Sequence, residues 1–285
     1  MKKLFIVFQF CIPQHLLSRL LGAIAESRIV FLKNFLIRRF INHYQVNMAE
    51  AERQLPEEYT CFNDFFTRQL RPGVRPISPD LGLILSPADG VVSAIGNINA
   101  GEIFQAKGKS YSLLSLVGGD TALAETYQHG SFATLYLSPR DYHRVHMPIS
   151  ARLQKMRYVP GRLFSVNQTT AEGIDNLFAR NERAICHFQS QHCPMAMILV
   201  GALIVAGIET RWAGQFTPGK SVVSENYTEE KAVTLNRGEE MGLFKLGSTV
   251  ILLFPPGKVR WTDTLGPGSE IRMGQAIGHF QSAES

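Results

Sequence analysis

Beyond residue 80 the chain alternates short apolar runs with turn residues, and this pattern restricts its fold more than any other feature. The run from Met195 to Ile208 is broken by Gly201 and Gly207, so it predicts two strands or one bent strand rather than a buried helix. Residues 250–254 end at a Pro-Pro-Gly turn and are expected to form a buried strand. Three further apolar runs are expected to be strands: Val91-Val92, 132–137 and 152–159.

Helix is expected in only two parts of this region, around residues 110–127 and 171–181. The chain has 24 glycines and 14 prolines spread along 285 residues, which indicates many turns and suits a β-rich fold. Its apolar content of 45% against 19% charged residues excludes a disordered chain. We therefore predict an α+β fold with an antiparallel β-rich core and an N-terminal amphipathic helical segment.

The positive charge of the chain lies almost entirely in residues 1–45. Seven lysines and arginines oppose Glu26 alone there, a net of +6, whereas the other 240 residues sum to −1. Apolar residues recur at helical spacing over 16–24 and 29–40, which predicts two amphipathic helices. These helices could pack on the core. The combination of basic and apolar residues favours instead an anionic membrane surface, and it argues against nucleic acid.

The first residues also have features of a targeting segment. Lys2-Lys3 and the apolar run 4–12 resemble the start of a signal peptide, but Pro13 and Arg19 interrupt the pattern and apolar periodicity continues beyond it. A transmembrane helix needs about 20 apolar residues, and no window of the sequence offers them without charge. We expect membrane-associating helices over 1–45, a turn-rich connecting segment over 46–75 and a second domain over 76–285.

The cysteines favour neither a disulfide framework nor a metal site. Four cysteines are too few and too scattered for such a framework in a chain of this length, so a reducing compartment is expected. The segment from Cys186 to Cys193 holds two cysteines and two histidines, but zinc ligands usually come as two separated pairs. We therefore expect a hairpin tip here, and no metal.

Three separated segments carry polar residues suited to acyl transfer: 86–90 with Asp89, 138–148 with His143 and His146, and 242–251 with Ser248. Each also has a structural explanation, because Asp89 belongs to a common turn pair, the histidines could be a surface pair and Ser248 could start a strand. An aspartate, a histidine and a serine could form a catalytic triad, although spacing alone does not identify one. The Gly-x-Ser-x-Gly motif of ordinary lipases and esterases is absent from the sequence.

Longer motifs in and around these segments resemble those of a known family. They cover residues 62–68, 105–113, 158–167, 176–183, 209–214, 238–242 and the run Leu246-Gly247-Ser248-Thr249. Over almost the whole chain, and in this order, they resemble the motifs of the bacterial phosphatidylserine decarboxylases, which are membrane-associated pyruvoyl enzymes. The Leu-Gly-Ser-Thr run is the cleavage signature of that family, whereas the Cys/His octet is not part of its pattern.

The resemblance implies that the chain cuts its own peptide bond between Gly247 and Ser248. Ser248 Oγ would attack the Gly247 carbonyl, with His146 as general base and Asp89 as the carboxylate that orients it. A glycine suits the turn that this attack requires. His143 is implied to assist decarboxylation and the protonation that follows it. The loop 160–167 is expected to help hold the substrate headgroup.

Cleavage would give a β chain of residues 1–247 and an α chain of residues 248–285 that begins with a pyruvoyl group derived from Ser248. This carbonyl would form a Schiff base with the substrate amine and act as the electron sink, so neither a metal nor pyridoxal phosphate is expected. The implied reaction converts phosphatidylserine to phosphatidylethanolamine and CO₂, by a peripheral enzyme on the cytoplasmic side of the inner cell membrane. The two chains would form a heterodimer, and the resemblance implies a dimer of these.

Two other functions are alternatives to the decarboxylase, and they differ in what they require of the same residues. A Ser-His-Asp lipid hydrolase would keep an intact chain and a free Ser248. A non-catalytic membrane adaptor would require the loss of Asp89, His146 or Ser248, and all three are present.

Overall fold

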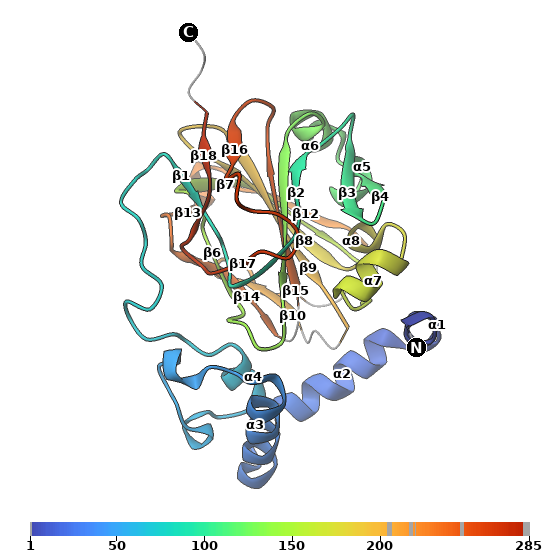
Figure 1. The fold of residues 1–285 in the computed structure, drawn as a ribbon, viewed down its shortest axis with the longest axis vertical. Helices are drawn as coiled ribbons and strands as arrows, with labels where there is room; N and C mark the ends of the chain where they lie inside the picture. The colour runs from blue at the N-terminus through green and yellow to red at the C-terminus, as the bar shows by residue number, and fades with distance from the viewer. Residues whose placement is uncertain (1, 204–206, 217–218, 220, 246–247, 282–285) are drawn as a thin grey trace.

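The computed structural model describes residues 2–203, 207–216, 219, 221–245 and 248–281. Figure 1 shows a β-rich body with the N-terminal helices gathered at one end and the C-terminus at the other. The helices are α1 (Lys2–Cys11), α2 (Gln14–Ala25), α3 (Val30–Tyr44), α4 (Phe62–Phe66), α5 (Leu113–Leu116), α6 (Thr121–Tyr127), α7 (Gln168–Gly173) and α8 (Leu177–Arg180), with short 3-10 helices at Met48–Glu50, Pro56–Glu58 and Glu229–Lys231.

The largest sheet has nine strands, and every strand pair in it is antiparallel. Its strands, in spatial order, are β12 (Val223–Asn226), β7 (Ala151–Val159), β8 (Arg183–Gln189), β9 (Pro194–Gly201), β15 (Ser248–Phe254), β5 (Ser131–Leu137), β2 (Gly90–Asn97) and β17 (Glu270–Ile271), and β13 (Thr234–Leu235) also pairs with β7.

Three smaller antiparallel sheets complete the β body. The four-stranded sheet contains β11 (Gly214–Gln215), β10 (Gly207–Thr210), β14 (Glu240–Lys245) and β6 (Arg144–His146). The three-stranded sheet contains β1 (Leu83–Leu85), β18 (Ala276–Phe280) and β16 (Val259–Trp261), and the two-stranded sheet contains β3 (Glu102–Ala106) and β4 (Lys109–Ser112).

The central strands are covered on both faces, which explains why their sequences are almost continuously apolar. All residues of β15 are buried. Because successive side chains of a strand point to opposite faces, Val250 and Leu252 enter one core while Ile251 and Leu253 enter the other. The first core is shared with the three- and four-stranded sheets, and the second is covered by α5 to α8.

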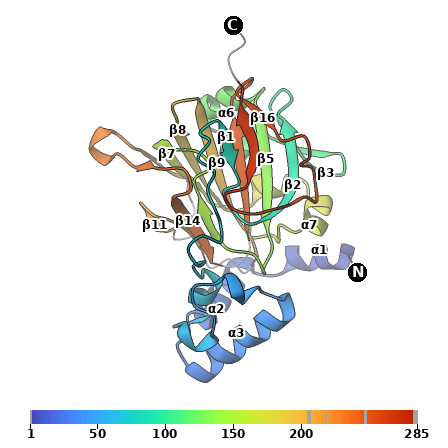
Figure 2. The ribbon, with the colours of Figure 1, turned by 60° about the vertical axis from the view of Figure 1, so that its left-hand side comes forward.

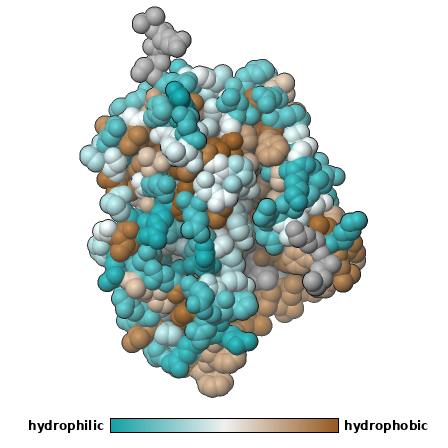
Figure 3. Space-filling model, in the orientation of Figure 1, coloured by the Kyte–Doolittle hydropathy of each residue, from teal (hydrophilic) through white to brown (hydrophobic). Residues whose placement is uncertain are grey.

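The N-terminal helices lie below the β body in both Figures 1 and 2. A third core holds α3 and α4 together around Ile37, Tyr59, Phe65 and Phe66. Many apolar side chains of α1 to α3 are nevertheless exposed, among them Leu4, Phe8, Leu16, Leu20, Val30, Phe31 and Phe35. Figure 3 shows this apolar surface at the lower right, where Figure 1 has α1 and α2.

The predicted α+β class with an antiparallel β core is confirmed, and so are two strands within 195–208, namely β9 and β10. The Cys/His octet forms the β8–β9 hairpin, as expected. Both helices predicted for the body were wrong in extent. Residues 110–127 are divided because Gly118 and Gly119 have positive φ angles, and residues 171–181 are divided at Asn176 for the same reason.

Within the described ranges, no single helix has both the length and the apolar character that a membrane span requires. The adjacent helices α1 and α2 meet these requirements only when taken together, and they are bent by 88° relative to each other.

Candidate active site

Three strands of the large sheet bring the candidate catalytic segments to one end of the sheet. Ser248 is the first residue of β15 and pairs with Leu137, the last residue of β5. On the other side of β5, Val91 near the start of β2 pairs with Tyr136. Since neighbouring strands are about 5 Å apart, Asp89 and Ser248 flank β5 at the same end of the sheet.

Ser248 is completely buried, and its Oγ has no hydrogen-bond partner among the described residues. Burying a hydroxyl without a partner costs about 1–3 kcal/mol, and such groups in a native fold call for a functional explanation. Gly247, whose carbonyl the family resemblance implies to be the target of Ser248, lies outside the described residues.

His143 is buried beside the point where β14 leads into β15. Its backbone carbonyl accepts a hydrogen bond from the Phe244 amide (3.0 Å), and its Nδ1 lies 2.9 Å from the carbonyl oxygen of Asp141. A carbonyl can only accept, so Nδ1 carries the proton and Nε2 keeps a free lone pair. This Nε2 is buried and has no partner among the described residues. Burial lowers the pKa of His143 to about 3, so the imidazole is neutral at pH 7.

His146 lies three residues further along β6 and faces Glu240, at the opposite end of β14. Its Nδ1 donates to the carbonyl oxygen of Gly238 at 2.9 Å, and the Tyr142 hydroxyl donates to its Nε2 at 2.9 Å. Burial lowers the pKa of His146 as well, which favours the neutral imidazole. His146 is therefore a base whose lone pair is occupied by Tyr142.

Asp89 is held by an arginine rather than by His146. Arg75 donates to both carboxylate oxygens, with 2.9 Å between Nε and Oδ1, and the Met273 amide donates to Oδ1 at 2.8 Å. The two segments still meet through the backbone, since the His146 amide donates to the carbonyl of Pro87 (2.8 Å). The structure thus brings Asp89 and His146 to neighbouring positions, with no hydrogen bond between their described side chains.

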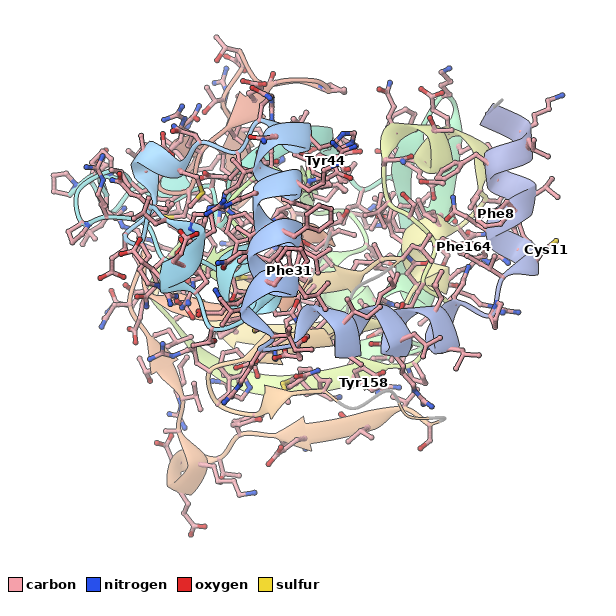
Figure 4. All side chains as sticks on the ribbon, turned by 90° about the horizontal axis from the view of Figure 1, so that it is seen from below. Phe8, Cys11, Phe31, Tyr44, Tyr158 and Phe164 are labelled. Carbon is pink, nitrogen blue, oxygen red and sulfur yellow. The ribbon has the colours of Figure 1, made fainter. Side chains whose placement is uncertain are left out.

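The loop 160–167 is attached to the N-terminal helices by side-chain amides. Gln14 Oε1 accepts a hydrogen bond from the Leu163 amide (2.8 Å), and Gln9 Oε1 accepts one from the Ser165 amide (2.7 Å). The ring of Phe164 lies 4.8 Å from that of Phe10, and Figure 4 shows Phe164 beside α1. A segment expected to hold the headgroup is therefore connected directly to α1 and α2.

Four residues of the site were not identified from the sequence: Phe66, Arg75, Tyr142 and Gly238. The ring of Phe66 packs against that of His143, with 4.1 Å between ring centres. Arg75 lies in the segment interpreted as a connection, and Gly238 is 92 residues from the histidine that it contacts. Three of them lie in segments already singled out (62–68, 138–148 and 238–242), but no role was assigned to them there. Tyr142 contacts a histidine on the same segment, whereas the other contacts form only when distant segments pack together.

Two family models match the chain. A model described as "Phosphatidylserine decarboxylase" matches residues 62–279, and a model described as "PSD" matches residues 4–45.

Proteins named "Phosphatidylserine decarboxylase proenzyme" are similar to the chain over nearly its whole length. The protein from Pseudomonas fluorescens is 55% identical, with 97% of each chain covered. The protein from Stutzerimonas stutzeri is 53% identical over 97% of this chain and 94% of its own. The protein from Bordetella petrii is 54% identical over 96% of each chain.

Proposed function

The chain belongs to the phosphatidylserine decarboxylase family, and from this membership we propose that it is a self-processing proenzyme that decarboxylates phosphatidylserine to phosphatidylethanolamine and CO₂. The observation that carries the proposed chemistry is the buried, unpartnered hydroxyl of Ser248 at the start of β15. It belongs to the Leu-Gly-Ser-Thr cleavage signature, and the unpartnered Nε2 of His143 is buried at the same end of the sheet.

In the proposed self-cleavage, Ser248 Oγ attacks the carbonyl carbon of Gly247, and the bond from that carbon to the Ser248 nitrogen breaks. The hydroxyl proton passes to His146 Nε2 and then to the departing amine, which leaves an ester. Loss of the Ser248 Cα proton expels the Gly247 carboxylate and leaves dehydroalanine. Addition of water and release of ammonia then produce the pyruvoyl group. A general base of this kind contributes roughly 10²–10⁴ in rate.

His146 has a partner that fixes its reactive tautomer. Gly238 O holds the proton on Nδ1, which is the task of the orienting carboxylate in a catalytic triad. The hydrogen bond to Gly238 and the charge of Glu240 oppose the effect of burial on the His146 pKa, and the negative charge of Asp89 adds a smaller effect in the same direction at longer range. Before the attack, the Tyr142 hydroxyl must leave Nε2.

The surroundings of Ser248 fit a pyruvoyl group. Its hydroxyl makes no hydrogen bond to a described residue, so the loss of this oxygen from Cβ, which becomes the methyl carbon while Cα becomes the carbonyl, breaks no described interaction. A carbonyl at this position supplies the electron sink for the charge that remains when CO₂ leaves. Burial of the site excludes water, which strengthens electrostatic interactions there.

His143 is the residue that we propose to move protons during turnover. The substrate ammonium must lose a proton before it can react as a nucleophile, and the free lone pair of His143 Nε2 can accept it. The same proton can then be returned to the carbon from which CO₂ has departed. The Asp141 carbonyl and the Phe66 ring hold the imidazole in place for both steps.

The two products of cleavage would remain associated as a heterodimer. The α chain contributes β15 between β5 and β9, and β17 pairs with β2. A further hydrogen bond joins Met273 of the α chain to Asp89 of the β chain. Separation would expose a fully buried central strand, which carries a large free-energy cost.

Peripheral attachment to the cytoplasmic side of the inner membrane is supported by the apolar and basic character of α1 to α3. Phe31, at 82% exposure, is the most exposed large apolar side chain among the described residues. An apolar pocket of about 550 Å³ lies between these helices, with Phe40, Phe66 and Pro139 in its wall. Because Phe66 also contacts His143, this pocket offers an acyl chain a path toward the site.

The mass of the purified protein tests the proposed function. Cleavage predicts fragments of residues 1–247 and 248–285 in place of the 31.8 kDa chain, together with CO₂ release from phosphatidylserine. Ser248→Ala should abolish both. Thr134→Val removes another buried hydroxyl, from the adjacent strand β5, and should leave both intact. A protein that releases CO₂ from phosphatidylserine but remains a single chain would refute the pyruvoyl mechanism. A single chain that instead hydrolyses the lipid would support the alternative of a Ser-His-Asp hydrolase.

The same assays distinguish the proposed roles of His143 and His146. His146→Ala should block cleavage, whereas His143→Ala should be cleaved but release CO₂ slowly. Normal cleavage of His146→Ala would exclude it as the base for processing.

A further inference from the structure

Arg68 is a buried cation, and no carboxylate of the described residues forms an ion pair or hydrogen bond with it. It is 3% exposed, and its Nε and Nη1 have no hydrogen-bond partner among the described residues. Its Nη2 donates to the carbonyl oxygens of Arg140 (2.9 Å) and Asp141 (3.3 Å). The guanidinium also lies over the Phe65 ring, 5.6 Å from its centre, and the charges of Asp89, Asp141 and Glu50 act on it without a hydrogen bond. A buried guanidinium with two unused donors is still unfavourable, and a bound anion would explain why it is kept.

Arg68 lines a polar cavity of about 500 Å³ that also has Asp89 and Tyr142 in its wall. The other arginines of this wall already have carboxylate partners: Arg75 pairs with Asp89 and Glu50, Arg140 with Glu270, and Arg272 with Glu50. Among the described residues of the cavity wall, Arg68 is thus the arginine without a carboxylate partner, so it is the one that could bind an anionic ligand.

Arg68 is also adjacent to the proposed proton carrier. The carbonyl oxygen of Asp141 accepts hydrogen bonds from both Arg68 Nη2 and His143 Nδ1, so the guanidinium and the imidazole meet at one atom. Phe66, two residues before Arg68, packs on the other part of the His143 ring. An anion bound by Arg68 would therefore be held next to the reacting end of a substrate.

We propose that Arg68 binds the phosphodiester group of the phospholipid headgroup, an assignment that rests on the proposed function. The headgroup carries two anions, the phosphodiester and the serine carboxylate. A guanidinium paired with the carboxylate would stabilise the charge that must flow away as CO₂ leaves, and it would slow the reaction. The phosphodiester keeps its charge throughout, so binding it positions the substrate without this penalty.

An interaction of this kind strengthens the binding of the substrate and of the transition state equally, so its loss should raise KM and leave kcat unchanged. For Arg68→Gln we expect KM for phosphatidylserine in mixed micelles to rise about 10- to 100-fold, the range for losing a charge-assisted hydrogen bond, with kcat little changed. Arg68→Lys keeps the charge and should recover part of the affinity. Arg71→Gln removes an exposed arginine three residues away and should behave as wild type.

Headgroup analogues identify which anion Arg68 binds. The cleaved wild-type enzyme should be inhibited at least ten times more strongly by glycerophosphoethanolamine than by ethanolamine, and Arg68→Gln should lose this difference. If wild-type enzyme shows no such preference, or if Arg68→Gln and Arg68→Lys keep wild-type KM, the assignment is overturned. A loss of inhibition by serine in Arg68→Gln, with inhibition by glycerophosphoethanolamine retained, would assign the carboxylate instead.

Folding and the proposed function are checked independently of these readouts. Cleavage at residue 248 and the thermal melting curve report whether each Arg68 variant folds. Wild-type CO₂ release from phosphatidylserine reports the proposed function. A wild-type enzyme that does not release CO₂ refutes that function, whereas an active wild type with unaltered Arg68 variants refutes only the role of Arg68.

Discussion

The hydroxyl of Tyr142 lies 2.9 Å from Nε2 of His146 and donates its proton to the lone pair through which that histidine would act as a base. The tautomer is fixed by Gly238, so the other ring nitrogen cannot take over this role. In the proposed self-cleavage, Tyr142 would therefore compete with Ser248 for His146.

We expect Tyr142→Phe to cleave faster than wild type, because the phenyl ring leaves Nε2 free. One hydrogen bond is worth about 0.5–1.5 kcal/mol, which corresponds to a rate about 2- to 10-fold higher. The cleaved fraction of newly synthesised protein can be followed on gels. Tyr127→Phe, which removes a hydrogen bond of equal length to His187, is the matched control. Slower cleavage of Tyr142→Phe would mean that the hydroxyl assists the reaction.

Arg75→Met should destabilise the protein strongly, because it leaves two carboxylates, Asp89 and Glu50, without their buried cation. The Arg75 and Asp89 side chains are 6% and 11% exposed, and breaking a buried pair costs about 3–5 kcal/mol. Arg38→Gln breaks a pair with Glu57 in which the side chains are 64% and 47% exposed, and it should change the free energy of unfolding much less, because water screens an exposed pair. Urea unfolding of both variants, made in the uncleaved Ser248→Ala background, measures the difference. Equal costs would show that Arg75 is not a structural anchor of Asp89.

Stability should fall in acid, in part because of His143. Below pH 6.5 the unfolded chain binds a proton at this histidine, whereas the folded chain, with its pKa of about 3, does not. The contribution is therefore complete above pH 6.5 and decreases by about 1.4 kcal/mol per pH unit as the pH falls toward 3. Urea unfolding at several pH values measures how the free energy of unfolding depends on pH. This dependence should be shallower for His143→Gln than for the protein with His143, both in the uncleaved Ser248→Ala background.

Membrane binding should depend on the exposed apolar residues of α3. Phe31→Asp replaces a side chain that is 82% exposed, and loss of its burial in lipid should weaken binding to anionic vesicles about 10- to 100-fold. Leu81→Asp changes a residue of similar exposure, 69%, on the β body and should have no effect in the same sedimentation assay. Both variants should cleave normally. If Phe31→Asp and Leu81→Asp bind vesicles equally well, α3 is not part of the membrane-binding surface of the protein.

Local patterns of residues are sufficient to predict several of the helices and strands. Strand β15 is fully buried because its sequence is apolar at every position, and α2 and α3 follow the 3.6-residue spacing of Leu16, Leu20 and their successors. A contiguous motif also makes Ser248 the candidate for self-cleavage, since a cleavage site must contain both sides of the bond that breaks.

Tertiary structure alone decided how the charged and proton-carrying groups are partnered. Arg75 forms hydrogen bonds with the Asp89 carboxylate, 14 residues away in the sequence. Gly238 accepts a hydrogen bond from His146 at a sequence separation of 92 residues, and Arg68 donates one to the Asp141 carbonyl at a separation of 73. None of these pairs leaves a periodic or contiguous trace in the sequence, because a hydrogen bond depends on distance in space and can join any two segments that the fold brings together. The sequence therefore identified Asp89, His143, His146 and Ser248 as candidates, and the packing of β2, β5, β6 and β15 with the 46–75 segment decided what each of them contacts.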